Sequence, residues 1–507
     1  MHQIKSVFLT MLYKNIDSIV AALLGITAVF LLTQHGGVGI SPDSIYYISA
    51  AYSVKQGQGF MQFDDSPFVL FPVMYPIFLL LVNLISTKDI VVIAPLMNAI
   101  LFGFTIFLSG VIVEKMNFSK VAKWITLAIL VLSPSLLEIY SMLWSETLFI
   151  VEILIFIWFC NSYFNKASFQ NLIGLAIITS IAAVTRLAGV TLIISGALLI
   201  LFHLKNSGGK QWKHLFVYGL LASFLLGLNL IRNYIVASSF TGVRQKGDTS
   251  LLTNIKYFGD VMGNWFLFSK LPHFNALVVG ILFFICIHFI FIYTFLKNKR
   301  NNTLEKIVTC FVLVYSLFIL ISATLSKYET INNRLLAPIF ITLILSVGFY
   351  LFRFIQSIKF SITKFAYIVL LWGLSVGVIF NYYKEFEAMY SENKEGGIGG
   401  YSDDDWVYSD LLLSLKKDNS IFNKGIPVYS NASHAVYFFT KKHLLILPET
   451  KHQEDLQQFY ALPQHILIWL NNEDNPAIED LEEIKKHKNL TLLKQYKDGF
   501  IYVCTPK

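Results

Sequence analysis

The sequence predicts a polytopic α-helical membrane bundle that is followed by a small soluble α/β domain. Of the 507 residues, 55% are hydrophobic and 14% are charged, and the mean hydropathy is +0.59. Soluble domains carry about 25% charged residues. Apolar runs of roughly 17 to 25 residues, enough to cross a hydrocarbon core of about 30 Å, recur as far as Tyr383. Beyond Tyr383 the chain becomes polar and charged, which indicates a second domain.

The apolar runs predict about 11 membrane spans. One further run, Met74–Ser86, holds only 13 residues and begins beside Pro72 and Pro76. This length is short for a span and is typical of a re-entrant or interfacial helix. The predicted spans are 18–32, 89–113, 121–137, 147–163, 170–185, 187–204, 214–236, 276–296, 306–324, 335–355 and 365–382.

Basic loops predict the orientation of these spans. If Met74–Ser86 does not cross the membrane, the most basic loops lie on the same side as the N-terminus, as the positive-inside rule requires. The first run has no small-residue cleavage site behind it, so we expect a retained helix. We therefore expect an integral protein of the bacterial plasma membrane, with its N-terminus in the cytoplasm and its C-terminal domain outside. The basic residues that carry this argument are Lys5, Lys14, Lys205, Lys210, Lys213, Lys297, Lys299 and Arg300.

The expected domains are a membrane domain, residues 1–383, and an extracytoplasmic α/β domain, residues 384–507. The break between them contains the glycine-rich run Lys394–Gly400. Short apolar strands then alternate with predicted helices near 404–417, 452–461 and 477–487, which is typical of a small α/β domain. The expected strands lie in IPVYSN, HLLILP, HILIWL, LTLL and FIYVC.

Charge and cysteine usage exclude two classes of function. The formal net charge is +8, but the basic residues lie in short loops between spans, so we expect no nucleic-acid binding. The four cysteines show no metal-ligand spacing, and neither a disulfide framework nor a structural zinc site is indicated. His35, Lys55 and His273 are isolated, which favours solvent exposure over metal binding.

Two carboxylates near span ends are candidates for chemistry on the outer face. Asp43 follows Pro42 at the start of a predicted helix, and Glu146 follows Ser145 at the start of another. Each position also has a structural interpretation, because acidic residues near a helix N-terminus satisfy free N–H groups and complement the helix dipole. Glu138 is a rival for any role given to Glu146.

Cations near the outer face are candidates for binding phosphate. Arg186 interrupts a pair of spans, Arg232 ends one and Arg334 begins another, while Arg244 and Lys246 lie in a loop between spans. A single arginine at such a place is usually an interfacial anchor. Several on one face suit a lipid phosphate, because a guanidinium binds phosphate oxygens with a bidentate fork.

These residues follow one another along the chain, and share one predicted side of the membrane, in a pattern that resembles the polyprenyl-phosphate-dependent glycosyltransferases of the GT-C superfamily. They look closest to bacterial relatives of protein O-mannosyltransferases and lipid A aminoarabinose transferases. The family's usual second acid is replaced by Ser44, and its paired prolines by Phe71–Pro72. The matching motifs are PDSIYYISAAYSVKQGQGF with Asp43, FPVMYPIFLLL with Pro72, Tyr75 and Pro76, WSETLF with Glu146, TRLAG with Arg186, the pair Arg232–Asn233, Arg334–Pro338, and the tail VYSNASHAVYFFTKKHLLILP.

The resemblance implies a GT-C-like fold and an inverting transfer of sugar from a polyprenyl phosphate to a lipid, glycan or protein acceptor among membrane lipids. Asp43 would be the base, with Glu146 orienting the acceptor or holding a divalent cation together with Asp43. Whether a metal is bound stays open, and no other cofactor is implied. Phosphate-binding residues would be Arg186, Arg232, Arg334, Arg244 and Lys246, and cavity-shaping residues Tyr46, Tyr47, Pro72, Tyr75 and Pro76.

A transporter or flippase for lipid-linked saccharides is the alternative, since it also needs spans and internal arginines. A transporter predicts charges spread through the membrane thickness and paired broken helices. A non-catalytic receptor leaves the carboxylates and arginines of separate loops unexplained. The ionisable groups of this chain gather on one predicted face, which favours the enzyme.

Overall fold

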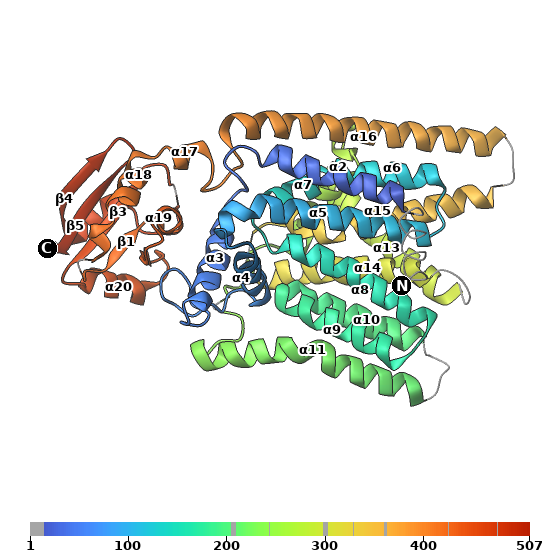
Figure 1. Ribbon diagram of the computed structural model, residues 1–507, viewed down its shortest axis with the longest axis horizontal. Coiled ribbons are helices and arrows are strands. Elements are labelled where there is room, and N and C mark those ends of the chain that lie inside the picture. The colour runs from blue at the N-terminus through green and yellow to red at the C-terminus, as the bar shows by residue number, and fades with distance from the viewer. Residues whose placement is uncertain are drawn as a thin grey trace. The chain divides into compact units, whose positions relative to one another are not determined.

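The computed structural model (Figure 1) describes residues 15–203, 209–242, 244–297, 303–327, 329–358, 362–423, 425–473 and 475–507. Of the basic residues that support the predicted orientation, Lys5, Lys14, Lys205, Lys299 and Arg300 lie outside these ranges. The chain forms two compact units. Unit 1 comprises Met1–Leu32, Val69–Tyr75 and Ala94–Ser391, and unit 2 comprises Thr33–Phe68, Pro76–Ile93 and Glu392–Lys507.

Each predicted span coincides with a helix. The bent pair α6 (Lys120–Val131) and α7 (Pro134–Ser141) together cover the run predicted at 121–137. The other helices at predicted spans are α2 (Ile16–Leu32), α5 (Ile90–Lys115), α8 (Glu146–Asn165), α9 (Phe169–Thr185), α10 (Val190–His203), α11 (Gly209–Ala237), α13 (Ala276–Lys297), α14 (Thr303–Leu325), α15 (Asn333–Ser357) and α16 (Ile362–Gly396).

The helices confirm a polytopic membrane bundle. Seven of the described helices are long and apolar enough to cross a membrane, and the α6–α7 pair, bent by 46°, makes an eighth candidate. The bend falls where Pro134 removes a backbone donor. α2 and α9, with 17 residues each, are shorter apolar helices.

The core of unit 1 is a continuous layer of apolar side chains between the helices. α9 packs against α8 and α11, and α14 packs against α10, α13 and α15. Phe102, Phe149, Phe156 and Tyr315 are among its fully buried side chains. Without a hydrophobic force between helices in lipid, such close packing holds a membrane bundle together.

The short apolar run forms a helix with the predicted bounds, α4 (Met74–Ser86), of 13 residues. Pro76 lies in its first turn, where a missing N–H breaks no helical hydrogen bond. Another helix that was not predicted as a span, α12 (Leu251–Trp265), packs against α13 and α14. Its N-cap is Ser250, whose side chain accepts from Thr253 N.

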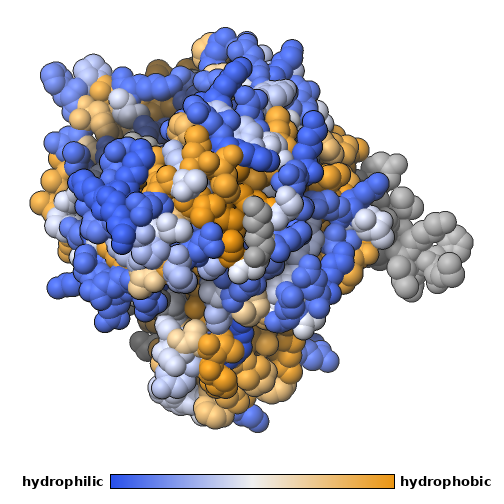
Figure 2. All heavy atoms as spheres, turned by 90° about the vertical axis from the view of Figure 1, so that its left-hand side faces the viewer, coloured by the Kyte–Doolittle hydropathy of each residue, from blue (hydrophilic) through white to orange (hydrophobic). Residues whose placement is uncertain are grey.

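Unit 2 contains a five-stranded sheet in the order β2–β1–β3–β5–β4. All five predicted strands are present: β1 (Val428–Ser430), β2 (Leu445–Ile446), β3 (His465–Leu470), β4 (Lys488–Tyr496) and β5 (Gly499–Pro506). β1 is parallel to β2 and β3, whereas β5 is antiparallel to β3 and β4. The face drawn in Figure 2 carries hydrophilic residues interspersed with hydrophobic ones.

The helices of the C-terminal segment are α17 (Asp404–Val407), α18 (Asp410–Lys417), α19 (Ser433–Thr440), α20 (Gln453–Ala461) and α21 (Leu481–His487). Four of them match predicted helices, and α19 does not. Leu447, Phe459, Leu467, Ile484 and Cys504 form the sheet's small core. These observations confirm an α/β segment at the end of the chain.

Unit 2 also contains α3 (Pro42–Lys55), which packs against α19. The ring of His434 on α19 lies 5.2 Å from that of Tyr46 and 4.8 Å from that of Phe63, measured between centroids. Tyr437 lies 5.6 Å from Phe63 in the same way. Aromatic contacts of this kind join α3 to the α/β segment within a single unit.

Candidate functional site

A buried carboxylate in unit 1 joins two arginines from different helices. Glu146, whose side chain is fully buried, is the first residue of α8. Its Oε2 lies 2.6 Å from Nη1 of Arg186, and its Oε1 lies 2.6 Å from Nε of Arg334. We call Glu146, Arg186 and Arg334 the arginine triad. The sequence separates the partners widely, and the fold brings three of the predicted site residues together.

The end of α9 positions Arg186. The helix stops at Thr185, and Arg186 takes an extended conformation (φ −143°, ψ 144°) before the 3-10 turn η1 (Leu187–Gly189). Its Nη1 also donates to Ser145 Oγ at 2.9 Å. Gly189 makes the turn possible, because a Cβ there would lie 2.3 Å from Ala182 O. The TRLAG motif thus turns one arginine out of a helix and toward Glu146.

The first turn of α15 positions Arg334. Asn332 caps this helix by accepting from Leu335 N at 3.1 Å. The Arg334 guanidinium lies over the ring of Trp144, 4.2 Å from its centroid, a contact that favours a cation. Its Nη1 is also 3.7 Å from Glu329 Oε1. A cap, an aromatic face and two carboxylates therefore hold the guanidinium in place.

The arginine triad carries one net positive charge, because one carboxylate faces two guanidinium groups. The side chains of Arg186 and Arg334 are 17% and 12% exposed, so both are largely but not completely covered. Glu329 is 42% exposed, and water screens its charge. Guanidinium groups held in fixed positions bind phosphate oxygens well, since no further ordering is needed. Chemically, the triad is suited to an anion.

Glu138, the rival of Glu146 in the sequence analysis, contacts the residue next to Arg334. Its Oε2 accepts from Asn333 Nδ2 at 2.6 Å, and Asn333 Oδ1 accepts from Trp265 Nε1 at 2.6 Å. The neighbouring residue of Asn333 in sequence is Arg334. The two rival acids therefore hold adjacent residues at the start of α15, Glu146 by an ion pair and Glu138 by a hydrogen bond.

The remaining predicted cations lie apart from the triad's ion pairs. Arg232 Nη1 donates to Asn233 Oδ1 at 3.0 Å near the end of α11. Arg244, in the following loop, donates to Leu70 O at 3.1 Å. Lys246 is exposed and forms an antiparallel bridge with Ser326, in the connection that leads to α15. None of these contacts involves Glu146.

Asp43 is the second residue of α3, within unit 2, and is partly buried. The helix is capped by its neighbours: Ser44 Oγ accepts from Ser41 N at 3.0 Å and lies 3.2 Å from Ser41 Oγ. Ser44, at the place of the family's second acid, is therefore a capping residue.

The predicted cavity-shaping residues are divided between the units. Tyr46 and Tyr47 lie on α3, where burial and the charges of Asp64 and Asp43 raise the pKa of Tyr46. Tyr75 is fully buried and Pro72 is buried, both in unit 1, whereas Pro76 belongs to unit 2.

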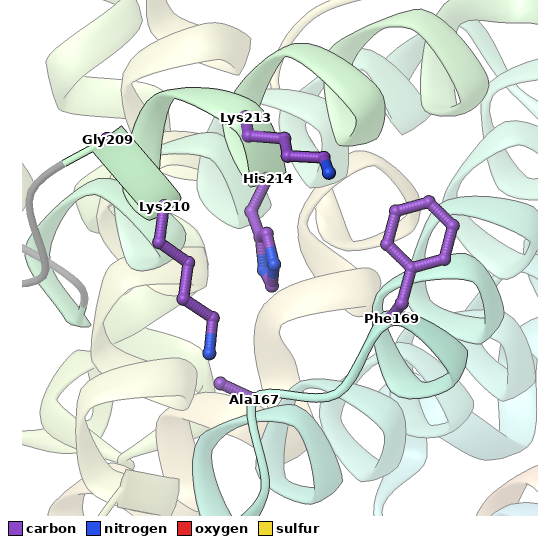
Figure 3. Close-up of a pocket in the computed structure, with 6 residues that line it drawn as sticks. All are labelled: Ala167, Phe169, Gly209, Lys210, Lys213 and His214. Carbon is purple, nitrogen blue, oxygen red and sulfur yellow. The ribbon is translucent and has the colours of Figure 1, made fainter.

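A pocket of unit 1 lies away from these residues. It has a volume of about 610 Å³ and is lined by the loop after α8 and the start of α11, with Lys210, Lys213 and His214 (Figure 3). Figure 3 shows Lys210 extending from α11 toward Ala167. Glu146 begins α8 and this loop follows its end, so 20 residues separate them, or about 30 Å at 1.5 Å per residue. This pocket is distinct from the arginine triad.

Sequence reasoning missed the residues that contact or adjoin the arginine triad. Trp144 and Ser145 precede Glu146 directly, and Asn333 precedes Arg334, so adjacency was the available signal. Glu329 lies five residues before Arg334 and had no such signal. For a metal, no group of three or more His, Cys, Asp or Glu side chains is arranged to hold an ion within the described ranges.

Two solved structures share the architecture of this chain over almost its whole length. ArnT from Cupriavidus metallidurans in the apo state superposes with a TM-score of 0.56 at 11% identity, covering 96% of this chain and 97% of that one. The same protein bound to undecaprenyl phosphate gives 0.57 at 12% identity, with the same coverage. No protein-family profile and no curated protein sequence matches the chain. The likeness confirms an ArnT-like fold, with a helical membrane bundle and a C-terminal α/β domain.

Proposed function

We propose that this chain is a membrane glycosyltransferase that moves a sugar from a polyprenyl-phosphate donor to an acceptor at the outer face of the bacterial plasma membrane. The observation that carries the proposal is the arginine triad, in which Glu146 orients Arg186 and Arg334 and leaves one net positive charge. The structural likeness to ArnT bound to undecaprenyl phosphate supports a polyprenyl phosphate as the anion.

In the proposed reaction the acceptor hydroxyl attacks the anomeric carbon of the donor sugar. Its proton passes to the carboxylate of Asp43, while the bond between the anomeric carbon and the phosphate oxygen breaks on the opposite side. The sugar is transferred with inversion, and the polyprenyl phosphate leaves with the bonding electrons. A positioned base contributes typically 10²- to 10⁴-fold. Arg186 and Arg334 would stabilise the charge that develops on the phosphate.

Glu146 acts in this scheme as a positioning residue. Each of its oxygens lies 2.6 Å from a guanidinium nitrogen, so both oxygens of the buried carboxylate already contact an arginine. Removing one partner of a buried ion pair costs about 3–5 kcal/mol. We therefore assign it the placement of the two arginines.

The proposal is tested by Arg334→Gln in purified protein, with binding of undecaprenyl phosphate as the readout. Loss of a charge-assisted contact worth about 1.5–3 kcal/mol corresponds to about 10- to 100-fold weaker binding. Arg353→Gln is the matched control, since Arg353 lies on the same helix, α15, and pairs with buried Glu305 at 3.4 Å. Equal binding by wild type and Arg334→Gln would contradict the proposal.

A further inference from the structure

The pocket between the α8–α9 connection and the start of α11 has a basic lining. Lys210, Lys213 and His214 come from the first turns of α11, and Ala167 and Phe169 lie across from them (Figure 3). Both lysines are exposed, so a ligand can reach them. Within the described part of the chain, the lining contains no carboxylate. The charge of this pocket therefore favours an anion.

His214 brings a buried polar group to the same pocket. The residue is 6% exposed, and Figure 3 shows its ring between Lys210 and Phe169. Its Nδ1 lies 2.7 Å from the hydroxyl of Tyr163. Among the residues that the structure describes, its Nε2 makes no hydrogen bond. When the Tyr163 hydroxyl donates to Nδ1, Nε2 carries the ring proton and can donate to a ligand oxygen.

Hydrogen bonds hold both walls of the pocket in place. Asn171 Nδ2 donates to Ser162 O at 3.0 Å and to Lys166 O at 2.8 Å, which fixes the connection between α8 and α9. Tyr218 OH, one turn beyond His214, donates to Thr179 Oγ1 of α9 at 3.2 Å. The polar groups are thus ordered before a ligand arrives, which lowers the entropy cost of binding.

An exposed apolar stripe runs from the pocket along α11. Phe216 and Leu220 follow Lys213 by three and seven residues, a spacing that places all three on one face of a helix. They are 72% and 59% exposed. Only 22% of the most apolar stretch of α11 is buried inside the bundle, and Figure 1 shows this helix along one edge of unit 1. The lysines therefore lie at the polar end of a surface that faces lipid.

Cations beside an exposed apolar face match a phospholipid, whose phosphate is anionic and whose acyl chains are apolar. The predicted orientation puts this end of α11 in the cytoplasmic leaflet, where anionic lipids create a negative surface potential that attracts basic residues. Lysines that only set the orientation of a span need neither a cavity nor a buried histidine. A soluble anion would leave the apolar stripe without a role.

We infer that this pocket binds the headgroup of an anionic phospholipid. Lys210 and Lys213 pair with the phosphate, His214 contacts one of its oxygens, and an acyl chain lies along Phe216 and Leu220. The lipid would connect the α8–α9 loop to α11 from outside the bundle. This site is separate from the proposed transfer reaction and does not depend on it.

The test is native mass spectrometry of the full-length protein in a neutral detergent. The protein is titrated with phosphatidylglycerol and with phosphatidylcholine of the same acyl chains, whose choline cation offsets the phosphate. We expect wild type to bind phosphatidylglycerol about 30-fold more tightly, or about fivefold for each lysine. Lys210→Gln combined with Lys213→Gln should abolish this preference, and the two Lys→Arg changes should preserve it.

The matched control is Lys120→Gln combined with Lys364→Gln. This variant loses the same charge from the first turns of α6 and α16, outside the lining, and should keep the wild-type preference. An equal loss of preference in the control would overturn the inference, because it would indicate a diffuse effect of surface charge.

Three other results would overturn the inference. Wild type could bind the two lipids equally, or the preference could survive in the variant that lacks Lys210 and Lys213. Glycerol 1-phosphate, which carries the phosphate without acyl chains, tests the third: displacement of phosphatidylglycerol at equal concentration would indicate a site for a soluble anion. None of these measurements involves sugar transfer, so their failure would leave the proposed function untouched.

Discussion

Asp43 and Glu146 are both acids in the first turn of a helix, yet their surroundings differ. Glu146 is fully buried and paired with two guanidinium groups, whereas Asp43 is partly buried on a helix that Ser41 and Ser44 cap. An ion-paired carboxylate is a poor base, because proton uptake would break its ion pairs. This contrast is our reason for proposing that Glu146 positions the arginines and that Asp43 is the base.

Asp43→Asn is expected to lower turnover by about 10²- to 10⁴-fold, the usual contribution of a positioned base. Binding of the donor should stay within about twofold of wild type, because the arginine triad is untouched. The measurement is transfer from a radiolabelled polyprenyl-phosphate sugar by purified protein. Asp410→Asn is the matched control, since Asp410 lies in the first turn of α18 in the same unit. Wild-type turnover by Asp43→Asn would exclude this residue as the base.

His434 predicts a pH dependence for the packing of α3 on α19. Burial lowers the pKa of His434 to about 4, although the charge of Asp64 opposes the shift. The unfolded histidine, with its usual pKa of about 6.5, takes up a proton first, so stability falls as the pH falls from 6.5 toward 4. Uptake of one proton by the unfolded state lowers the free energy of unfolding by at most about 1.4 kcal/mol per pH unit.

Hydrogen exchange of the amides of α3 and α19, at pH 7.5 and 5.5 and corrected for intrinsic rates, measures this effect. We expect a lower free energy of opening at pH 5.5 in wild type and a smaller difference in His434→Phe. His452→Gln, at an exposed histidine, should behave like wild type. His465, whose pKa burial also lowers to about 4, should leave part of the pH dependence. An unchanged difference in His434→Phe would refute the assignment.

The sequence predicts the residue types of the site better than their pairing. Glu146, Arg186 and Arg334 were identified because an ionisable group near a span end is costly unless it is used. Their ion pairs join residues that are 40 and 188 positions apart, and no local pattern reports such a contact. The role that we propose for Glu146, placing the two arginines, rests on these ion pairs. The roles of Asp43, Arg232, Arg244 and Lys246 stay predictions.

At the scale of elements, the break between α9 and α10 is the feature that the site depends on. Arg186 leaves the helix there, and η1 returns the chain to a helical path through Gly189. The sequence showed the break as an arginine between two apolar runs. The sequence did not show that Gly189 lies against the backbone of Ala182, because this contact depends on the three-dimensional path of the turn.

Gly189→Ala is expected to destabilise the protein and weaken donor binding together. The new Cβ would lie 2.3 Å from Ala182 O and 2.6 Å from Ala183 Cα, so the turn must shift and take Arg186 with it. Overpacking of this kind costs about 1–3 kcal/mol. Thermal unfolding and undecaprenyl phosphate binding are the measurements. Gly219→Ala on α11, where nothing lies within 4 Å of the new Cβ, should change neither. Donor binding like wild type in Gly189→Ala would contradict this coupling.

Elements with strong patterns were predicted well, and elements without them were not. The five strands follow from short apolar runs between turn residues, and α4 follows from an apolar run too short for a span. Helix α19 has eight residues, ASHAVYFFT with its cap, and its aromatic content resembles that of a strand. Its packing against α3 decides its structure, and that contact joins segments almost 400 residues apart.

For the whole molecule, hydropathy was sufficient for the fold class. Apolar length identifies spans because every backbone polar group in lipid must be satisfied within a helix. The likeness to ArnT over 96% of the chain at 11–12% identity shows that the fold persists although most side chains differ. Hydropathy does not predict how the few polar side chains are arranged in space, because they contribute little to the hydropathy pattern along the chain.

The orientation is a prediction that belongs to the whole molecule. With the N-terminus in the cytoplasm and residues 384–507 outside, alkaline phosphatase fused after Lys507 should be active in cells, and a fluorescent protein that folds only in the cytoplasm should be dark there. A truncated fusion after Gly209, in a basic loop expected inside, should give the opposite pair of results. A cytoplasmic C-terminus would reverse the predicted sidedness of every polar segment.

The Glu146 carboxylate has a consequence for the end of the catalytic cycle under the proposed function. Two arginines without it would present two positive charges, and the polyprenyl phosphate left after transfer would be held as a product inhibitor. The carboxylate removes one of those charges while fixing the guanidinium groups in place. The same residue that prepares the enzyme to capture a charged carrier thereby shortens the time for which the spent carrier stays bound.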